Sequence, residues 1–198
     1  MTITRRFNFI NNEQITALCV NGNFVWTAFA QNSDAVCILE KQFVSQPDQV
    51  FFSIEKTVNK ILKIVGDNTN IYVAYQDDTL FGEIFSVLNP LTTTTEITIP
   101  SGITEYPVDI FVNGTDLFFL LPGSASGTNA QLIKYNTSGV FQEIIDLNQS
   151  GDIVTNAQSM TIDSLGDIWI VTNSSPANVI RVYELSGGGW AFTITEII

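Results

Sequence analysis

Histidine is absent from this 198-residue sequence. The chain therefore lacks the usual general base, the commonest nitrogen ligand for metals, and any Ser–His or Cys–His dyad. Carboxylates are the groups left for acid–base chemistry. We therefore expect no enzymatic activity, no catalytic residues, no metal site and no cofactor.

Cysteine is almost as rare, with only Cys19 and Cys37. These two residues fall in the first and third expected strands of one repeat, so one whole strand separates them. Strands two apart in a sheet lie roughly 9–10 Å from each other, beyond the reach of a disulfide. We expect two unbridged thiols, and two cysteines without histidine are too few to hold a structural zinc.

Long apolar runs are also missing. No segment approaches the ~18 apolar residues that a membrane-spanning helix needs. The first ten residues contain Arg5 and Arg6, but Asn11, Asn12 and Glu13 interrupt any apolar continuation, so they do not form a signal peptide. The sequence predicts synthesis in the cytoplasm and no membrane partner.

Basic residues are few: 8 Lys and Arg stand against 20 Asp and Glu, for a net charge of −12. Binding to nucleic acid is disfavoured, because phosphate contacts need clustered Lys and Arg. Residues 1–63 carry six basic and five acidic side chains, and residues 64–198 carry two and fifteen. The acidic excess is either a solvated surface that aids solubility or a sign that the first repeat, which lacks it, is the docking side.

What the sequence does contain is a repeat. An apolar run, a turn of Asn, Asp or Gly and an aromatic-rich apolar run occur four times, in residues 18–28 (LCVNGNFVWTA), 64–74 (IVGDNTNIYVA), 110–120 (IFVNGTDLFFL) and 161–171 (TIDSLGDIWIV). If Phe24, Ile71, Leu117 and Ile168 are equivalent buried positions, the spacings are 47, 46 and 51 residues. A period of this length is typical of propeller blades.

Two more apolar runs follow in each repeat. The third run contains Ile38, Phe85, Ile133 and Val182, and the fourth covers residues 50–54, 96–99, 141–145 and 190–198. The prediction is an all-β fold of four repeats of about 46 residues with four antiparallel strands each, a small four-bladed β-propeller. The expected blades are residues 15–55, 59–100, 106–147 and 157–198 of one domain. A β-sandwich and a β-solenoid are the alternative architectures.

The last repeat resembles a known family. Residues 160–173 (MTIDSLGDIWIVTN) and 179–183 (VIRVY) are similar to a blade of NHL-type and two-component-regulator-type propellers, whose pattern runs through Asp, Gly, an apolar–Trp pair and a distal apolar–aromatic pair. The first and third repeats match this pattern in part, and the second matches it poorly. The resemblance implies the fold and carries no function, because propellers include enzymes, lectins, receptors and scaffolds.

Candidate chemistry is sparse. The carboxylates that might pair are Asp67, Asp77, Asp78, Asp163 and Asp167, and each is better explained as a turn-capping residue. Residues 163–167 are a weak match to a calcium loop, and three glycines at residues 187–189 lack the helix and lysine of a phosphate loop. Trp26 and Trp169 are expected in the core, whereas Trp190 follows the glycines and is the best candidate for an exposed ring.

Residues 2–10 form an additional strand pattern outside the four repeats, with Ile3, Phe7 and Phe9 on one face. We expect this strand to pair with the outer edge of the fourth blade or with a neighbouring protein. Ile3, Phe7, Phe9 and Trp190 are therefore the candidate partner or ligand contacts.

The functional hypothesis is a non-catalytic structural or interaction module within a larger assembly. The composition, rich in Asn, Thr and Ile and free of His, resembles that of phage virion proteins, which suggests a virion or tail component with other proteins as partners. A carbohydrate-binding propeller is the alternative, with a glycan stacked on an exposed aromatic ring. A propeller hydrolase, with two carboxylates converging in a central channel, comes third.

Overall fold

The computed structural model describes residues 14–30, 36–90, 94–124, 129–147, 154–172, 179–186 and 189–195, with side chains described up to residue 172 except at residues 14, 47 and 48. These ranges hold sixteen strands and no helix. Within them, accordingly, no helix is long and apolar enough to cross a bilayer. The expectation of an all-β fold is confirmed.

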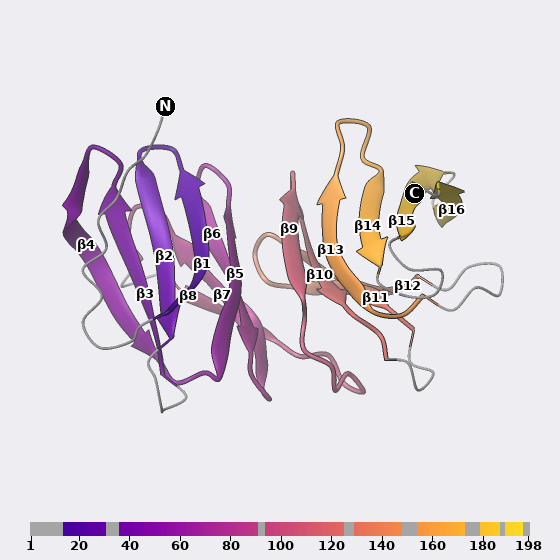
Figure 1. Ribbon diagram of the computed structural model, residues 1–198, viewed down its shortest axis with the longest axis horizontal. Coiled ribbons are helices and arrows are strands. Elements are labelled where there is room, and N and C mark those ends of the chain that lie inside the picture. The colour runs from indigo at the N-terminus through magenta and orange to yellow at the C-terminus, as the bar shows by residue number, and fades with distance from the viewer. Residues whose placement is uncertain are drawn as a thin grey trace. The chain divides into compact units, whose positions relative to one another are not determined.

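The strands form four antiparallel four-stranded sheets, each in chain order (Figure 1). Sheet 1 contains β1 (Gln14–Asn21), β2 (Phe24–Ala30), β3 (Cys37–Phe43) and β4 (Gln46–Lys56). Sheet 2 contains β5 (Lys60–Gly66), β6 (Asn70–Gln76), β7 (Leu80–Ser86) and β8 (Thr94–Thr98). Sheet 3 contains β9 (Asp109–Asn113), β10 (Asp116–Leu121), β11 (Gln131–Asn136) and β12 (Phe141–Asp146). Sheet 4 contains β13 (Ala157–Ile162), β14 (Ile168–Thr172), β15 (Val179–Ser186) and β16 (Gly189–Thr195).

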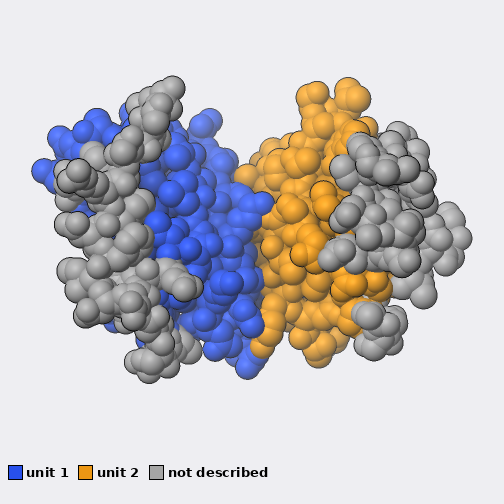
Figure 2. All heavy atoms as spheres, viewed as in Figure 1, with its two compact units in different colours: residues 1–96 blue, residues 97–198 orange. Residues whose placement is uncertain are grey.

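This is a four-bladed, propeller-like repeat, because every sheet is the same four-stranded meander. The chain divides into two compact units, residues 1–96 (unit 1) and 97–198 (unit 2), coloured separately in Figure 2. Within unit 1, β1 of sheet 1 lies beside β5 of sheet 2; within unit 2, β9 of sheet 3 lies beside β13 of sheet 4 (Figure 1).

The turn between the first two strands sets the equivalence of the sheets. Asn21 pairs with Phe24 and Asn113 with Asp116, while the amides of Asp67 and Asp163 donate to the carbonyls of Asn70 and Asp167. The residue that follows the second member of each pair is Val25, Ile71, Leu117 or Ile168, so these four positions are equivalent. The residues one further along, Trp26, Tyr72, Phe118 and Trp169, form the next set of equivalent positions.

Phe24 was therefore wrongly grouped with Ile71, Leu117 and Ile168. All four lie on the second strand of their sheet, but Phe24 is one residue out of register and is only half-buried, whereas the other three are fully buried. The turn Gly22–Asn23, in which Gly22 has a φ of 58°, is two residues long, like the corresponding turns of sheets 2 and 3. It places Phe24 at the first pair of the strand, and a one-residue shift moves a side chain to the other face.

Each sheet thus has two faces that recur through the repeat. We call the face that carries Trp26 or its equivalents the forward face, and the face that carries Val25 or its equivalents the rear face. In unit 1 the forward face of sheet 1 packs on the rear face of sheet 2: Trp26 and Ala28 share one cluster with Ile64, Ile71 and Val73. In unit 2 the forward face of sheet 3 packs on the rear face of sheet 4 in the same way, with Phe118, Leu120 and Leu132 against Met160, Ile168 and Ile170.

The two cysteines are free, as expected. Cys19 lies on β1 and Cys37 on β3, with β2 between them. Burial raises the pKa of both thiols, more than offsetting a backbone hydrogen bond and the charge of Lys60 near Cys37. The protonated thiol is therefore favoured at both positions at neutral pH.

Candidate functional site

Three of the aspartates that the sequence singled out, Asp67, Asp77 and Asp163, cap turns. The Asp67 Oδ1 accepts hydrogen bonds from the Thr69 amide at 2.7 Å and the Asn70 amide at 2.8 Å. Asp77 does the same for Thr79 and Leu80, at 2.8 and 3.0 Å. This is the Asx-turn geometry in which a carboxylate satisfies amides that the turn leaves free.

The hydrogen bonds also fix the charge of these groups. Partial burial alone would raise the pKa of Asp67, but hydrogen bonds from the Tyr72 hydroxyl, Thr69 and Asn70 outweigh it and lower the pKa. The same balance, with Thr79 and Leu80 as donors, lowers the pKa of Asp77. Both carboxylates are therefore ionised hydrogen-bond acceptors at neutral pH, not proton donors.

These turns keep the carboxylates apart. Asp67 precedes β6 and Asp77 follows it, so a whole strand of roughly 20 Å separates them. Asp78 is exposed beside Asp77. The described residues hold no group of three Asp, Glu or Cys side chains that could bind a metal ion.

In sheet 4, Asp163 and Asp167 belong to one turn. The Asp163 Oδ1 accepts from the amides of Leu165 at 2.8 Å and Asp167 at 3.1 Å, and its Oδ2 accepts from the Trp169 Nε1 at 3.0 Å. The bond from Trp169 is the largest contribution that lowers the pKa of Asp163. Residues 163–167, the weak match to a calcium loop, therefore form a turn in which the Asp163 carboxylate accepts a hydrogen bond from the indole of Trp169.

Two buried carboxylates escaped the sequence analysis. Glu83 on β7 is 4% exposed and accepts from the Tyr75 hydroxyl at 2.6 Å and from the Lys56 Nζ at 2.7 Å. Because Lys56 belongs to sheet 1 and Glu83 to sheet 2, this ion pair joins the two sheets of unit 1. Burial is the first cause of the strongly raised pKa of Tyr75, and the Glu83 charge adds to it, so the phenol stays protonated. The sequence signal was an acidic residue inside the apolar run Leu80–Ser86.

Asp109 on β9 is the second, at 2% exposed. Its Oδ2 accepts from the Ser159 Oγ at 2.7 Å and the Met160 amide at 2.8 Å, both on β13. This carboxylate therefore joins sheet 3 to sheet 4 inside unit 2. Its signal in the sequence was an acidic residue immediately before the apolar run 110–112.

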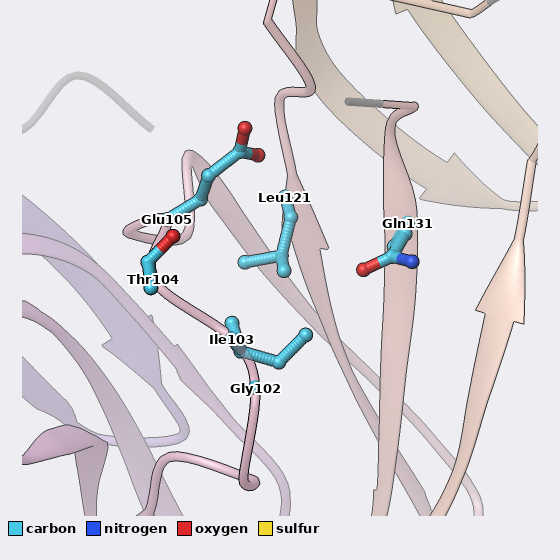
Figure 3. A pocket seen from close by; sticks show the side chains of 6 residues that line it. All are labelled: Gly102, Ile103, Thr104, Glu105, Leu121 and Gln131. Atoms are coloured by element: carbon cyan, nitrogen blue, oxygen red, sulfur yellow. The ribbon is translucent and has the colours of Figure 1, made fainter. Parts of the chain in front are cut away.

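A small pocket of about 150 Å³ lies in unit 2, between the loop 102–105 and the neighbouring strands β10 and β11. Figure 3 shows Ile103 and Leu121 near its centre, with Gln131 on the next strand. The Glu105 Oε2 accepts from the Gly123 amide at 3.0 Å, so its carboxylate is already engaged. Ligand sites usually measure ~300–1,000 Å³ and are lined by aromatic rings, and this pocket has neither property.

The tryptophans differ from one another. Trp26 is fully buried, which confirms it as core. Trp169, the equivalent residue of sheet 4, is only partly buried, so its assignment to the core was wrong. Trp190 is the second residue of β16 and pairs with Leu185 of β15, but its side chain lies outside the described residues. Ile3, Phe7 and Phe9 also lie outside the described residues.

An apolar surface lies on the rear face of sheet 1, the face turned away from sheet 2. Ile15, Leu18 and Val20 follow one another along β1 and are 36%, 52% and 52% exposed. On the same face, Val25 of β2 is half-buried, and Thr27 and Phe29 are buried. We call Ile15, Leu18 and Val20 the β1 patch.

Two apolar side chains lie on the forward face of sheet 4, the face turned away from sheet 3. They are those of Trp169, which is partly buried, and Val171, which is 42% exposed. Cross-strand pairing places Thr161 opposite Trp169 and Ser159 opposite Val171. We call Trp169 and Val171 the β14 patch. Contiguous exposed apolar side chains mark protein contacts, membrane contacts or ligand grooves.

Comparison with known proteins identifies the fold and nothing finer. No protein-family model matches the sequence, and no curated protein matches it. The computationally designed Ika8 protein matches in structure with a TM-score of 0.58 and 10% identity, over 89% of this chain and 47% of that one.

Two natural proteins match in a similar way. A eukaryotic initiation factor has a TM-score of 0.53 and 9% identity, over 87% of this chain and 41% of that one. The HIRA(644-1017) structure has a TM-score of 0.50 and 10% identity, over 92% of this chain and 52% of that one. This chain therefore spans about half the length of the propeller-like structures that it matches, and at such identity the likeness shows the fold alone.

Proposed function

We propose that this protein is a non-catalytic structural or interaction module of a larger protein assembly. The observation that carries the proposal is the β1 patch, in which three consecutive apolar side chains of one strand face are exposed. Large apolar side chains gathered on one surface of a folded domain are characteristic of protein contacts. The partners are other protein chains; a net charge of −12 disfavours nucleic acid.

The state of the carboxylates supports a non-catalytic role. Asp67, Asp77 and Asp163 serve turns, and Glu83 and Asp109 serve contacts between sheets. A glycoside hydrolase would need two carboxyl groups about 5–10 Å apart beside a substrate cleft. The pocket beside loop 102–105 is lined by one carboxylate, Glu105, which is already bound to the Gly123 amide.

Two finer parts of the proposal rest on the sequence. The turn of sheet 4, with Asp163, Gly166 and Trp169, resembles NHL-type and two-component-regulator-type blades, and we propose a relationship to those propellers. The composition supports an assembly such as a phage virion or tail, with the chain made in the cytoplasm.

The test is native mass spectrometry of the complex recovered with a tagged copy of the chain. The wild-type chain is expected at a fixed stoichiometry with other protein chains. Leu18→Asp places a charge in the β1 patch and should abolish recovery of the complex, because a desolvated unpaired charge is costly at an interface. Leu88→Asp is the matched control, since Leu88 is 82% exposed and lies outside the patch.

Recovery of the wild-type chain without any partner would contradict the assembly proposal. Binding to a glycan array that is lost in Trp190→Ala would instead favour the carbohydrate-binding alternative. An intact complex with Leu18→Asp would remove the β1 patch as the contact surface.

A further inference from the structure

We propose that the pocket beside loop 102–105 receives one cationic side chain, that of an arginine on a partner protein. The proposal rests on the interaction function above and names the chemistry of the partner. Three observations carry it: the size of the pocket, the Glu105 carboxylate on its wall and the charge of unit 2. The lining residues labelled in Figure 3 all belong to unit 2.

The pocket has the size of one side chain. Its volume is about 150 Å³. A cavity of that volume in a protein core is large enough to hold one benzene molecule, which is similar in size to a guanidinium group with its neighbouring methylene. A free substrate of ordinary size needs ~300–1,000 Å³ and is too large. The end of a single long side chain is therefore the occupant that the volume admits.

The pocket is apolar at its centre and polar at its rim. Ile103 and Leu121 lie near the centre (Figure 3), and Leu121 is 1% exposed. Thr104, Glu105 and Gln131 supply the polar groups around them. Arginine and lysine side chains suit such a surface, because their methylene stems lie along apolar groups while the charged end stays at a polar rim.

Glu105 supplies the negative charge. Its Oε2 accepts a hydrogen bond from the Gly123 amide at 3.0 Å, which holds the carboxylate at the pocket wall. A carboxylate can accept about four hydrogen bonds, so this one bond leaves capacity for a donor inside the pocket. Because the side chain is already held, little rotamer freedom is lost when a cation binds to it.

Backbone turns build the walls of the pocket. The Ile103 amide donates to the Pro100 carbonyl at 3.2 Å, and Gly102 between them has a φ of 87°. This value fits the third position of a type II turn, which favours glycine. Gly123, which binds Glu105, also has a positive φ, of 67°. The chain therefore forms the pocket without a partner, and this lowers the cost of binding.

Unit 2 carries an excess of negative charge. Residues 97–198 contain ten Asp and Glu but two Lys and Arg, a net charge of −8. Of the two basic residues, Lys134 lies on the forward face of sheet 3, where it pairs with Asp116 at 3.0 Å and Glu143 at 3.9 Å. The side chain of Arg181 lies outside the described residues. Such a surface attracts a cationic partner and repels an acidic one.

The acceptors lie on two sides of the pocket, which favours arginine over lysine. Figure 3 shows Thr104 and Glu105 on the loop side and Gln131 on the strand side. Asp146 lies opposite Gln131 in the strand pairing and adds a second acidic residue on that side. A guanidinium carries five donors in a planar fork and can bind acceptors on both sides at once, whereas an ammonium is a compact charge.

The first test uses the wild-type chain and three blocked peptides, each of glycine with one central residue: arginine, its neutral analogue citrulline, or lysine. The arginine peptide should cause saturable shifts of the amide NMR signals of Gly102, Ile103 and Gln131. We expect a Kd of about 1–10 mM, since one side chain provides little binding free energy. The citrulline peptide should cause no saturable shift.

The other outcomes of this test count against the proposal. No saturable shift with the arginine peptide overturns the site. Equal binding of the arginine and citrulline peptides overturns its ionic basis, and tighter binding of the lysine peptide overturns the choice of arginine. None of these outcomes depends on the folding of a variant.

The second test changes the carboxylate. Glu105→Gln removes the charge but keeps an oxygen that can accept from the Gly123 amide, so the pocket keeps its shape. It should weaken binding of the arginine peptide at least ~10-fold. Glu143→Gln is the matched control, because it removes the same charge from an exposed position of the same unit. Equal weakening by both variants would show attraction to the charge of unit 2 as a whole and would overturn the pocket.

The complex recovered with the tagged chain separates this proposal from the proposed function. Glu105→Gln should weaken the complex, as Leu18→Asp should. A complex that is lost with Leu18→Asp and fully kept with Glu105→Gln leaves the interaction function standing and removes the pocket from it. Binding of the arginine peptide by a chain that recovers no complex shows a site for free cations and overturns the partner protein as their source.

Discussion

Sheets 1 and 2 of unit 1 are built from the same repeat, yet equivalent side chains on the first strands of their rear faces differ in solvent exposure. Ile61 and Ile64 of sheet 2 are buried, and Ile15 and Leu18 of sheet 1, 46 residues earlier in the chain, are exposed. Both pairs are large, apolar and on a strand face of the same geometry. The comparison teaches that the sequence pattern decides which face is apolar, whereas a neighbouring sheet packed on that face decides whether it is buried.

The largest expected effect concerns the equivalent tryptophans. Trp26→Ala removes a fully buried ring from the contact between sheets 1 and 2 and should lower the free energy of unfolding by ~3–5 kcal/mol. Trp169→Ala, at the same position of sheet 4, should cost less than half as much in the isolated chain. Urea unfolding followed by fluorescence or circular dichroism measures both values.

Trp26→Phe is the control for the first substitution. It keeps an aromatic ring and removes an indole N–H that has no hydrogen-bond partner among the described residues. It should therefore cost clearly less than Trp26→Ala. Equal losses at Trp26 and Trp169 would contradict the distinction between covered and open faces.

The next effect concerns the ion pair that fastens sheet 1 to sheet 2. Glu83→Ala leaves the Lys56 ammonium and the Tyr75 hydroxyl without their buried acceptor, and should lower the unfolding free energy by about 3 kcal/mol. Lys56→Met combined with Glu83→Leu should recover much of the loss, because no buried charge remains unpaired. A double variant as unstable as Glu83→Ala would show that the loss came from packing.

A smaller effect compares the two rear faces directly. Ile64→Val removes one methylene from a buried side chain and should cost ~0.5–1.5 kcal/mol. Leu18→Val makes a similar change on the exposed β1 patch and should stay within ~0.5 kcal/mol in the monomer. Both are read from chemical denaturation at low protein concentration, where self-association does not contribute. A loss at Leu18 as large as that at Ile64 would mean that sheet 1 is covered in the isolated chain.

Most of the fold could be predicted from the sequence because the signals are local. The turn at Asn21–Gly22 and the alternation that follows define a hairpin, and the ~46-residue period locates its copies. The wrong grouping of Phe24 with Ile71, Leu117 and Ile168 also arose from a local pattern. Phe24 and Trp26 are both aromatic and two residues apart, and only counting from the turn shows that Val25 is equivalent to Ile71.

The third strands could not be aligned by counting from the second. Phe24, Ile71, Leu117 and Ile168 pair with Phe43, Phe85, Tyr135 and Tyr183. These partners lie 19, 14, 18 and 15 residues further on, because the loops between the strands differ in length. Ile38, Phe85, Ile133 and Val182 all lie on third strands, as predicted, but they differ in their register with the second strand.

The site depends on information that no local pattern carries. The environment of Trp169 depends on what packs on its face of sheet 4, and that of Glu83 on a lysine 27 residues away in another sheet. The aspartates behaved as predicted where the rule was local, since an Asx turn needs only the next three amides. Prediction was therefore reliable for turns and strand faces and poor for contacts between sheets.

The smallest expected effect is a difference in acid stability, and it again separates sheet 2 from sheet 1. The first turn of sheet 1 uses the neutral Asn21, whereas sheet 2 uses Asp67 at the equivalent position and Asp77 at its next turn. Hydrogen bonds lower the pKa of both aspartates below their usual value of 3.8. A carboxyl whose pKa is lower in the folded state stabilises the fold above its unfolded pKa, and this contribution is lost as pH falls through the folded pKa.

The free energy of unfolding should therefore decline between about pH 4 and pH 2. The decline should be more gentle in the Asp67→Asn and Asp77→Asn variants, whose amide oxygens still cap the turns. Urea unfolding of each protein across this range measures the slopes. Identical slopes for the variants and the wild type would show that these two carboxylates are not preferentially ionised in the folded protein.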